Sequence, residues 1–264
     1  MKIGFIGVGN MAKAMIGGIL KGNLVPPSDI IGSTSRESSL KDVVKQFGIN
    51  GTTDNREVAK AADVLVLSIK PQMYETVIEN IKDEISPKTL VVTIAPGFTL
   101  ERLSGLLGVN KKIIRTMPNT PAMVGEGVTA ICPNEKVSKE ELEYTIKIFE
   151  SFGKANVIKE SMMNGVISVS GSSPAYVYMF IEAMADGAVA LGLPRDMAYE
   201  MAAQAVLGSA KMILETGKHP GELKDMVCSP GGTTIEAVRS LEDSGFRSSI
   251  LEAMMACAEK ASKM

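Results

Sequence analysis

A glycine-rich run stands directly after the first apolar segment of the chain. Gly7-Val8-Gly9-Asn10-Met11-Ala12 reads G-x-G-x-x-A and follows the expected strand Lys2–Ile6. In such a turn the first glycine permits a tight bend and the second lets the backbone approach a pyrophosphate, while the small third residue allows close helix–strand packing. The N–H groups at the start of the next helix then bind the phosphates. We therefore favour a dinucleotide site here over a purely structural turn.

The end of the second expected strand indicates which dinucleotide is bound. Sites for NAD usually carry an acidic residue at this point to hold the ribose hydroxyls. This chain has Ser33-Thr34-Ser35-Arg36 instead, and its first acidic residue is Glu37. Hydroxyl donors and a guanidinium suit a 2′-phosphate. The pattern favours NADPH, with NADH as the alternative, although a solvated turn with a surface arginine would look the same.

Further loops that follow expected strands point to the same crevice, because the carboxyl ends of parallel strands line the ligand site in an open sheet. Two of these loops, Ser68–Pro71 and Ala95–Gly97, break their strands with proline. Taken alone, each is only a strand-ending turn. The expected cofactor-binding residues are Ile6, Gly7, Val8, Gly9, Asn10, Met11, Ser33, Thr34, Ser35, Arg36, Asn55, Ser68, Ile69, Lys70, Pro71, Ala95, Pro96, Gly97 and Asn119.

A second glycine-rich segment lies near the other end of the chain. Ser229-Pro230-Gly231-Gly232-Thr233-Thr234 precedes an expected helix, and Thr233 with Glu236 has the spacing of a capping box. Successive N–H groups at a helix start carry positive potential and can receive a small carboxylate. The alternative is a loop that merely caps the helix, and this segment alone would favour that alternative.

The first half of the chain alternates short β-type runs with helical patterns, which predicts a parallel sheet with right-handed crossovers. The expected strands are Lys2–Ile6, Ile30–Ser33, Val64–Ser68, Leu90–Ile94, Lys112–Met117 and Val128–Ile131. The expected helices between and after them are Met11–Lys21, Glu37–Gln46, Met73–Ile81, Thr99–Leu107 and Ser138–Phe152, the last opened by a capping box of Ser138 and Glu141.

From about Ser161 the sequence turns into long helical runs rich in Ala, Met and Leu. The expected helices start at Ser173-Pro174 (read as an N-cap followed by proline), at Arg195, at Thr234 and at Arg247. The fold class is therefore α/β, with an N-terminal Rossmann-type doubly wound parallel sheet in residues 1–157 and an all-helical C-terminal domain in residues 158–264. Helices this apolar predict a homodimer or a larger assembly of dimers, with an ordinary intrachain core as the alternative.

Composition limits the other functions. The 28 basic and 30 acidic side chains nearly balance and Trp is absent, which disfavours nucleic acid and acidic membrane surfaces as partners. The three cysteines have no C-x-x-C spacing and His219 is the single histidine, so we expect no metal site and no Ser–His triad. The N-terminus lacks the pattern of a secretory signal, and the expected location is the cytoplasm.

Several of these segments, in order along the whole chain, resemble the pyrroline-5-carboxylate reductase family. They are Gly7-x-Gly9-Asn10-Met11, Ser68-Ile69-Lys70-Pro71, Met117-Pro118-Asn119-Thr120-Pro121, Ser170-Gly171-Ser172-Ser173-Pro174-Ala175-Tyr176, and Cys228 to Thr234 with the flanking residues Pro220 to Glu242. One departure is Ser173, where many members have glycine. The resemblance implies that a nicotinamide hydride reduces 1-pyrroline-5-carboxylate to L-proline, the final step of proline biosynthesis.

The resemblance also implies roles for the second glycine-rich segment. Thr234 is the expected catalytic residue, with its hydroxyl on the ring nitrogen of the substrate. The N–H groups of Gly232, Thr233 and Thr234 are expected to hold the carboxylate, beside Gly231. Ser172 and Ser173, in a loop over residues 170–175, are expected to line the opposite wall.

Two rival functions remain: a β-hydroxyacid dehydrogenase, which needs a lysine that residues 164–186 lack, and a dinucleotide-binding sensor without turnover.

Overall fold

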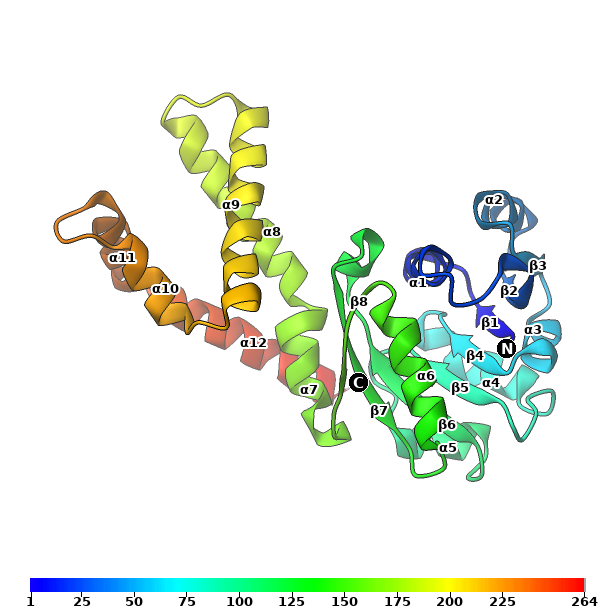
Figure 1. Ribbon diagram of the computed structural model, residues 1–264. Coiled ribbons are helices and arrows are strands. Elements are labelled where there is room, and N and C mark those ends of the chain that lie inside the picture. The colour runs from blue at the N-terminus through cyan, green and yellow to red at the C-terminus, as the bar shows by residue number, and fades with distance from the viewer. Residues whose placement is uncertain (264) are drawn as a thin grey trace. The chain divides into compact units, whose positions relative to one another are not determined.

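The computed structural model describes residues 1–263 and divides into two compact units (Figure 1). The first unit comprises Met1–Ser172 with the chain from Cys257 onward, and the second comprises Ser173–Ala256. This division falls later in the chain than the expected boundary between residues 157 and 158, which stays a prediction. Within residues 1–263, no helix combines the length and the apolar character needed to span a bilayer.

The first unit is built on an eight-stranded sheet in the order β3-β2-β1-β4-β5-β6-β7-β8. Neighbouring strands run parallel except β6 and β7, which are antiparallel. The strands are β1 (Ile3–Ile6), β2 (Ile30–Ser33), β3 (Asn50–Thr52), β4 (Val64–Leu67), β5 (Leu90–Thr93), β6 (Lys112–Met117), β7 (Gly127–Pro133) and β8 (Gly153–Val157). The predicted Rossmann-type parallel sheet is confirmed.

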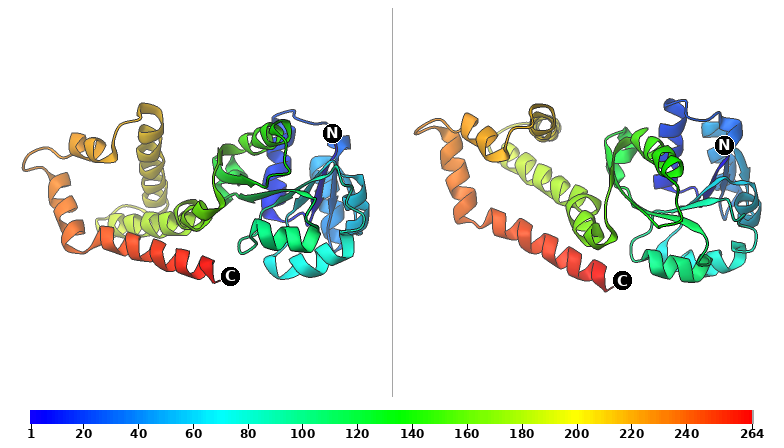
Figure 2. Two further views of the ribbon diagram at one scale, coloured as in Figure 1. Left: turned by 90° about the horizontal axis from the view of Figure 1, so that it is seen from below. Right: turned by 60° about the horizontal axis from the view of Figure 1, so that its bottom comes forward.

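Helices cover both faces of this sheet, as Figure 2 shows. They are α1 (Asn10–Lys21), α2 (Glu37–Phe47), α3 (Asn55–Ala61), α4 (Tyr74–Ile81), α5 (Leu100–Leu107) and α6 (Lys139–Glu150). Successive strand residues point to opposite faces. Phe5 and Val66 therefore join one core with α1 and α6, whereas Ile6 and Leu67 join another with α3, α4 and α5. Ser138 and Glu141 form the predicted capping box of α6.

Shorter helical segments complete the first unit. The single turns of 3-10 helix are η1 (Pro27–Asp29), η2 (Pro71–Met73), η3 (Thr120–Val124) and η4 (Glu160–Met162). Then come α7 (Met163–Val166) and a π-helical turn, η5 (Ile167–Gly171). The prediction of a loop over residues 170–175 is therefore wrong, because most of these residues are helical. Helical turns lead almost directly into the next helix, which starts at Ser173, so Ser173 is its first residue and not a cap.

The second unit consists of helices whose side chains are almost all exposed or only partly buried. They are α8 (Ser173–Ala190), α9 (Arg195–Thr216), α10 (Pro220–Val227), α11 (Thr233–Asp243) and α12 (Phe246–Ser262), the last of which continues into the first unit. Helices α8 and α9 pack together. Ala185, Ala198 and Ala202 are the residues between 173 and 256 that are buried.

Candidate functional site

The glycine turn after β1 has the geometry that a dinucleotide site requires. Gly7 has a positive φ of 86°, which a residue with a side chain rarely adopts. A Cβ atom there would also lie 2.6 Å from Cγ2 of Ile69. The N–H groups of Gly7 and Val8 both donate to the Ser33 carbonyl at 3.1 Å. The turn is thus fixed between the carboxyl ends of β2 and β4.

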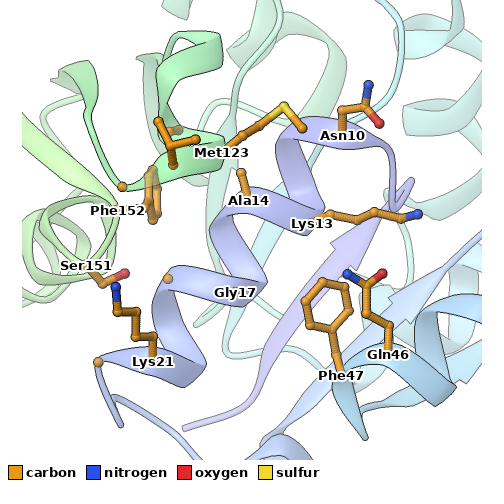
Figure 3. A pocket seen from close by; sticks show the side chains of 15 residues that line it. Asn10, Lys13, Ala14, Gly17, Lys21, Gln46, Phe47, Met123, Ser151 and Phe152 are labelled. Atoms are coloured by element: carbon orange, nitrogen blue, oxygen red, sulfur yellow. The ribbon is translucent and has the colours of Figure 1, made fainter. Parts of the chain in front are cut away.

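The start of α1 is open. Gly9 is its N-cap, no side chain caps the helix, and a Cβ atom on Gly9 would meet no atom within 4 Å. The first N–H groups of a helix have no partner inside it. This backbone can therefore receive a phosphate at close range. A hollow of about 700 Å³ runs along α1 from Asn10 past Lys13 and Lys21 (Figure 3), but Gly7, Val8 and Gly9 do not line it.

The end of β2 uses its polar groups in different ways. Ser33 is buried, and its hydroxyl donates to Oδ1 of Asn55 at 2.7 Å. The Thr34 hydroxyl donates to the Arg36 carbonyl at 2.9 Å. Ser35 and Arg36 are exposed, and the Arg36 guanidinium has no acidic partner within the described chain. Arg36 is thus free to bind an anion, whereas Ser33 orients the amide of Asn55.

The two loops after β4 and β5 are tied to their surroundings. The Ser68 hydroxyl donates to the Gly7 carbonyl at 2.7 Å, so this side chain supports the glycine turn. Beyond Ala95–Gly97, one carboxylate oxygen of Glu160 accepts from the Leu100 N–H and from Nη1 of Arg115, each at 2.7 Å. Sequence reasoning missed Glu160, because no local pattern joins it to residues so far along the chain.

Asn119 also has a structural task. It is 8% exposed, and its side-chain oxygen accepts from the Val128 N–H at 2.9 Å. Its Nδ2 donates to the Ser170 carbonyl at 3.1 Å. The amide therefore links the loop after β6 to the π-helical turn η5. The expected contact of Asn119 with the cofactor stays a prediction.

In the second unit, the glycine–threonine segment forms a turn that opens α11. Gly231 has a φ of 67°, and the Gly232 N–H donates to the Ser229 carbonyl at 3.0 Å. The predicted capping box is wrong: Gly232 is the N-cap, Thr233 already lies in the helix, and no side-chain cap forms. The Gly-Gly turn itself delivers the chain into the helix, and Glu236 pairs with Arg239 instead.

This arrangement changes which donors are available. The Gly232 N–H is occupied within the turn, so the free N–H groups are those of Thr233, Thr234 and Ile235 in the first turn of α11. The Thr234 side chain is half-buried, and its hydroxyl makes no hydrogen bond to the residues that the structure describes. A helix start with free amides and one free hydroxyl can bind a carboxylate and a neighbouring polar atom.

The remaining candidate groups have ordinary roles. The Ser172 hydroxyl lies 3.2 Å from Sγ of Cys257 in the first unit, and Ser173 opens α8. His219 caps α10, its Nδ1 accepting from the Gly221 N–H at 3.1 Å. Burial raises the pKa of the Cys132 thiol, which disfavours a reactive thiolate. The three cysteines are free, and residues 1–263 hold no cluster of acidic, His or Cys side chains suited to a metal ion.

The doubly wound sheet and its glycine turn place the chain in the class of Rossmann-type, nicotinamide-dependent oxidoreductases. Residues 2–97 match the family model described as NADP oxidoreductase coenzyme F420-dependent. Residues 160–264 match the model described as pyrroline-5-carboxylate reductase dimerisation. The chain belongs to the pyrroline-5-carboxylate reductase family.

Relatives support this over the full length. The chain is 53% identical to the pyrroline-5-carboxylate reductase of Escherichia coli strain K12, across 100% of this chain and 98% of that protein. A solved pyrroline-5-carboxylate reductase from Coxiella burnetii has a TM-score of 0.93 at 35% identity, covering 99% of this chain and 97% of that chain. The pyrroline carboxylate reductase of Plasmodium falciparum, solved with NADP bound, has a TM-score of 0.90 at 33% identity, with coverage of 99% and 97%.

Proposed function

We propose that this protein reduces 1-pyrroline-5-carboxylate to L-proline with hydride from NADPH, NADH being the alternative donor, as the final step of proline biosynthesis. The observation that carries the proposal is the full-length relation to the Escherichia coli reductase. The open glycine turn at α1 and the free amides at α11 supply the two kinds of receptor that this reaction needs.

The first unit holds the cofactor in this proposal. The pyrophosphate binds at the Gly7–Met11 turn, where the backbone of Gly9 is open and the start of α1 offers N–H donors. Arg36 pairs with the 2′-phosphate, and Asn55 contacts the adenosine side. The loops Ser68–Pro71 and Ala95–Gly97 line the nicotinamide half, because they follow the carboxyl ends of β4 and β5.

The second glycine turn holds the substrate. The N–H groups of Thr233 and Thr234, joined by that of Ile235, bind the carboxylate at the positive end of α11. The Thr234 hydroxyl hydrogen-bonds the ring nitrogen. Gly231 and Gly232 shape the turn, and Ser172 and Ser173 line the pocket.

The chemistry makes few demands on side chains. NADPH supplies the hydride, which adds to the carbon of the C=N bond while that bond's π electrons move to nitrogen. A protonated imine accepts hydride readily and becomes a neutral amine, so no proton has to move in the same step. The protein orients the reactants and stabilises charge, the usual share when a cofactor carries the reaction. This accounts for a site without a reactive His or Cys.

We further propose that the enzyme works as a homodimer in the cytoplasm. The match of residues 160–264 to a dimerisation model supports pairing through the C-terminal helices. The three free cysteines suit a reducing compartment.

Two assays, one in each direction of hydride transfer, separate this function from its rivals. The purified protein with NADPH and pyrroline-5-carboxylate should consume NADPH and form proline. With NADP⁺ and small 3-hydroxy acids it should form no NADPH. A sensor would bind NADPH without consuming it, and that result would overturn the proposal.

Thr234 variants test the substrate assignment. Thr234→Ala should keep NADPH affinity but lose kcat/KM by roughly tenfold to a few hundredfold, the value of one hydrogen bond to a charged group. Thr234→Ser should recover most of the activity. Thr216→Ala serves as the matched control, because it removes a hydroxyl at the end of α9 that donates to the Met212 carbonyl and accepts from the Lys218 N–H. A loss of many thousandfold would instead make Thr234 an obligatory proton donor.

A further inference from the structure

The pairing of strands β4 and β5 stops at their carboxyl ends, where the proposed cofactor loops begin. Their register ends at Leu67 opposite Thr93. Beyond that pair, the chain enters the loops Ser68–Pro71 and Ala95–Gly97, and the backbone groups at the junction lose their ladder partners. Such groups need other hydrogen bonds if they are buried.

Tyr74, the first residue of α4, fills this junction. It is 0% exposed, and its hydroxyl donates to the Leu67 carbonyl at 2.6 Å. The backbone of Ile94 and of Ala95 is near enough to the same hydroxyl to lower its pKa, although burial has the larger, opposite effect. Burial holds the pKa of Tyr74 far above its ordinary value, so the group stays a donor at any working pH. The hydroxyl thus ties the start of α4 to the end of β4, next to the backbone that follows β5.

The ring of Tyr74 is fixed from the other side. It stacks on Phe98, with ring centroids 4.6 Å apart and planes inclined by 28°. The Arg102 guanidinium lies 4.2 Å from the centre of the Phe98 ring. Arg102 also donates to the Gly97 carbonyl at 3.3 Å and to Glu75 at 2.9 Å. The starts of α4 and α5 are thereby joined beneath the Ala95–Gly97 loop.

The same junction connects to the glycine turn. Leu67 is followed by Ser68, whose hydroxyl donates to the Gly7 carbonyl at 2.7 Å. Ile69 packs where a Gly7 side chain would be, 2.6 Å from the Cβ position. A shift of Leu67 therefore moves the turn at Gly7 as well as its own loop.

We propose that Tyr74 is a positioning residue for hydride transfer, whose hydroxyl sets the separation of the two loops that hold the nicotinamide half of the cofactor. The proposal rests on the proposed function, because it needs the nicotinamide to lie at these loops. Tyr74 itself touches neither reactant. Its effect passes through Leu67, Ile94 and Ala95.

The test compares two buried hydroxyls, one at the carboxyl ends of the strands and one at their amino ends. Tyr74→Phe keeps the stacked ring and removes the hydroxyl. Thr89→Val removes a hydroxyl that is also buried, 2% exposed, and donates to the Ala62 carbonyl at 2.9 Å, but lies before the amino end of β5. Both variants are made in the full chain, and both should lower the unfolding temperature by similar amounts.

Only Tyr74→Phe should change the chemistry. We expect kcat to fall about tenfold, since a small misplacement of reacting atoms is costly, and the KM for NADPH to rise a fewfold. The kinetic isotope effect with NADPH deuterated at the transferable position should increase, because hydride transfer becomes the slow step. Arg102→Met, a surface change that spares the core, should shift the same quantities less. If Tyr74→Phe matches Thr89→Val in kcat and isotope effect, Tyr74 is only structural and the proposal is overturned.

A binding measurement keeps this proposal distinct from the proposed function. NADPH affinity, followed by the fluorescence of the bound cofactor, needs no turnover. If the wild-type protein shows no reductase activity, the proposed function fails, and hydride positioning fails with it. If the wild type is active and Tyr74→Phe binds and turns over NADPH as the wild type does, only the role of Tyr74 is refuted.

Discussion

At the scale of single residues, Gly9 is where we expect the backbone and the cofactor to come closest. Its φ of −86° suits any residue, and no atom lies within 4 Å of a Cβ placed there. Gly9→Val should therefore fold normally. Its side chain would occupy the space of the pyrophosphate, and we expect NADPH affinity to fall by roughly tenfold to a hundredfold, as for an overpacked contact. Thermal unfolding and NADPH titration measure the two effects. A folded variant with unchanged affinity would contradict the cofactor assignment.

Arg36 is the residue that we expect to decide which nicotinamide cofactor is preferred. Its guanidinium is exposed and has no acidic partner in residues 1–263, so a 2′-phosphate gains a full charge-assisted contact. Arg36→Ala should raise the KM for NADPH by roughly tenfold to a hundredfold and leave that for NADH nearly unchanged. Lys41→Ala, which removes an exposed charge from α2, is the control. An equal response to both cofactors would reduce Arg36 to a general surface charge.

At the scale of elements, α1 depends on two adjacent glycines that differ in their surroundings. A Cβ atom on Gly18 would lie 2.7 Å from Cβ of Phe152 and 3.0 Å from the Ser151 carbonyl oxygen. On Gly17 the nearest atom, Cε1 of Phe47, is 3.8 Å away. Gly18→Ala should thus push α1 off Phe152 and lower the free energy of unfolding by about 1–3 kcal/mol.

Gly17→Ala is the matched control for this prediction. It should raise the free energy of unfolding by up to about 1 kcal/mol, because alanine favours the helix. Because the proposed phosphate site lies at the start of α1, Gly18→Ala should also weaken NADPH binding, whereas Gly17→Ala should not. Denaturant unfolding of both variants gives the comparison. Equal stability would show that α1 is not anchored through Gly18.

The sequence predicted the elements with strong apolar patterns and missed those without them. β1 and α1 were predictable from an apolar run, a glycine turn and helical spacing. β3 and β8 lie at the sheet edges and are largely exposed, so they show no apolar alternation. The cap of α11 was misplaced by one residue, because a Gly-Gly turn replaces the side-chain cap that Thr233 and Glu236 suggest.

The candidate site was predictable where function depends on local backbone and unpredictable where it depends on tertiary partners. The glycine turns follow from sequence because their geometry is local. The bonds of Ser33 to Asn55, of Asn119 to Ser170 and of Tyr74 to the end of β4 join residues through the fold. No spacing rule shows which hydroxyls and amides are already occupied in this way.

At the scale of the whole molecule, the second unit cannot form a core from its own residues. Between residues 173 and 256 the buried side chains are three alanines, while Met179 is 68% exposed and Leu214 is 81% exposed. Large apolar surfaces of this kind mark association sites. We expect the protein to sediment as a dimer or a larger assembly at micromolar concentration, with no stable monomer.

Two substitutions of methionine by lysine test where the subunits meet. Met179→Lys places a charge on α8 and should weaken association and lower the unfolding temperature. Met123→Lys alters a methionine of similar exposure, 60%, outside the residues that match the dimerisation model, and it should leave the assembly intact. A well-folded wild-type monomer at micromolar concentration would refute the proposed dimer.

The most direct test of the account follows the hydride itself. The protein is incubated with pyrroline-5-carboxylate and NADPH that carries deuterium at the transferable position, and the proline formed is examined by mass spectrometry and NMR. We predict one deuterium per L-proline, on the ring carbon that formed the C=N bond, with one NADP⁺ produced for each proline. Proline without deuterium, or NADPH oxidation without proline, would contradict the assignment of this protein as a pyrroline-5-carboxylate reductase.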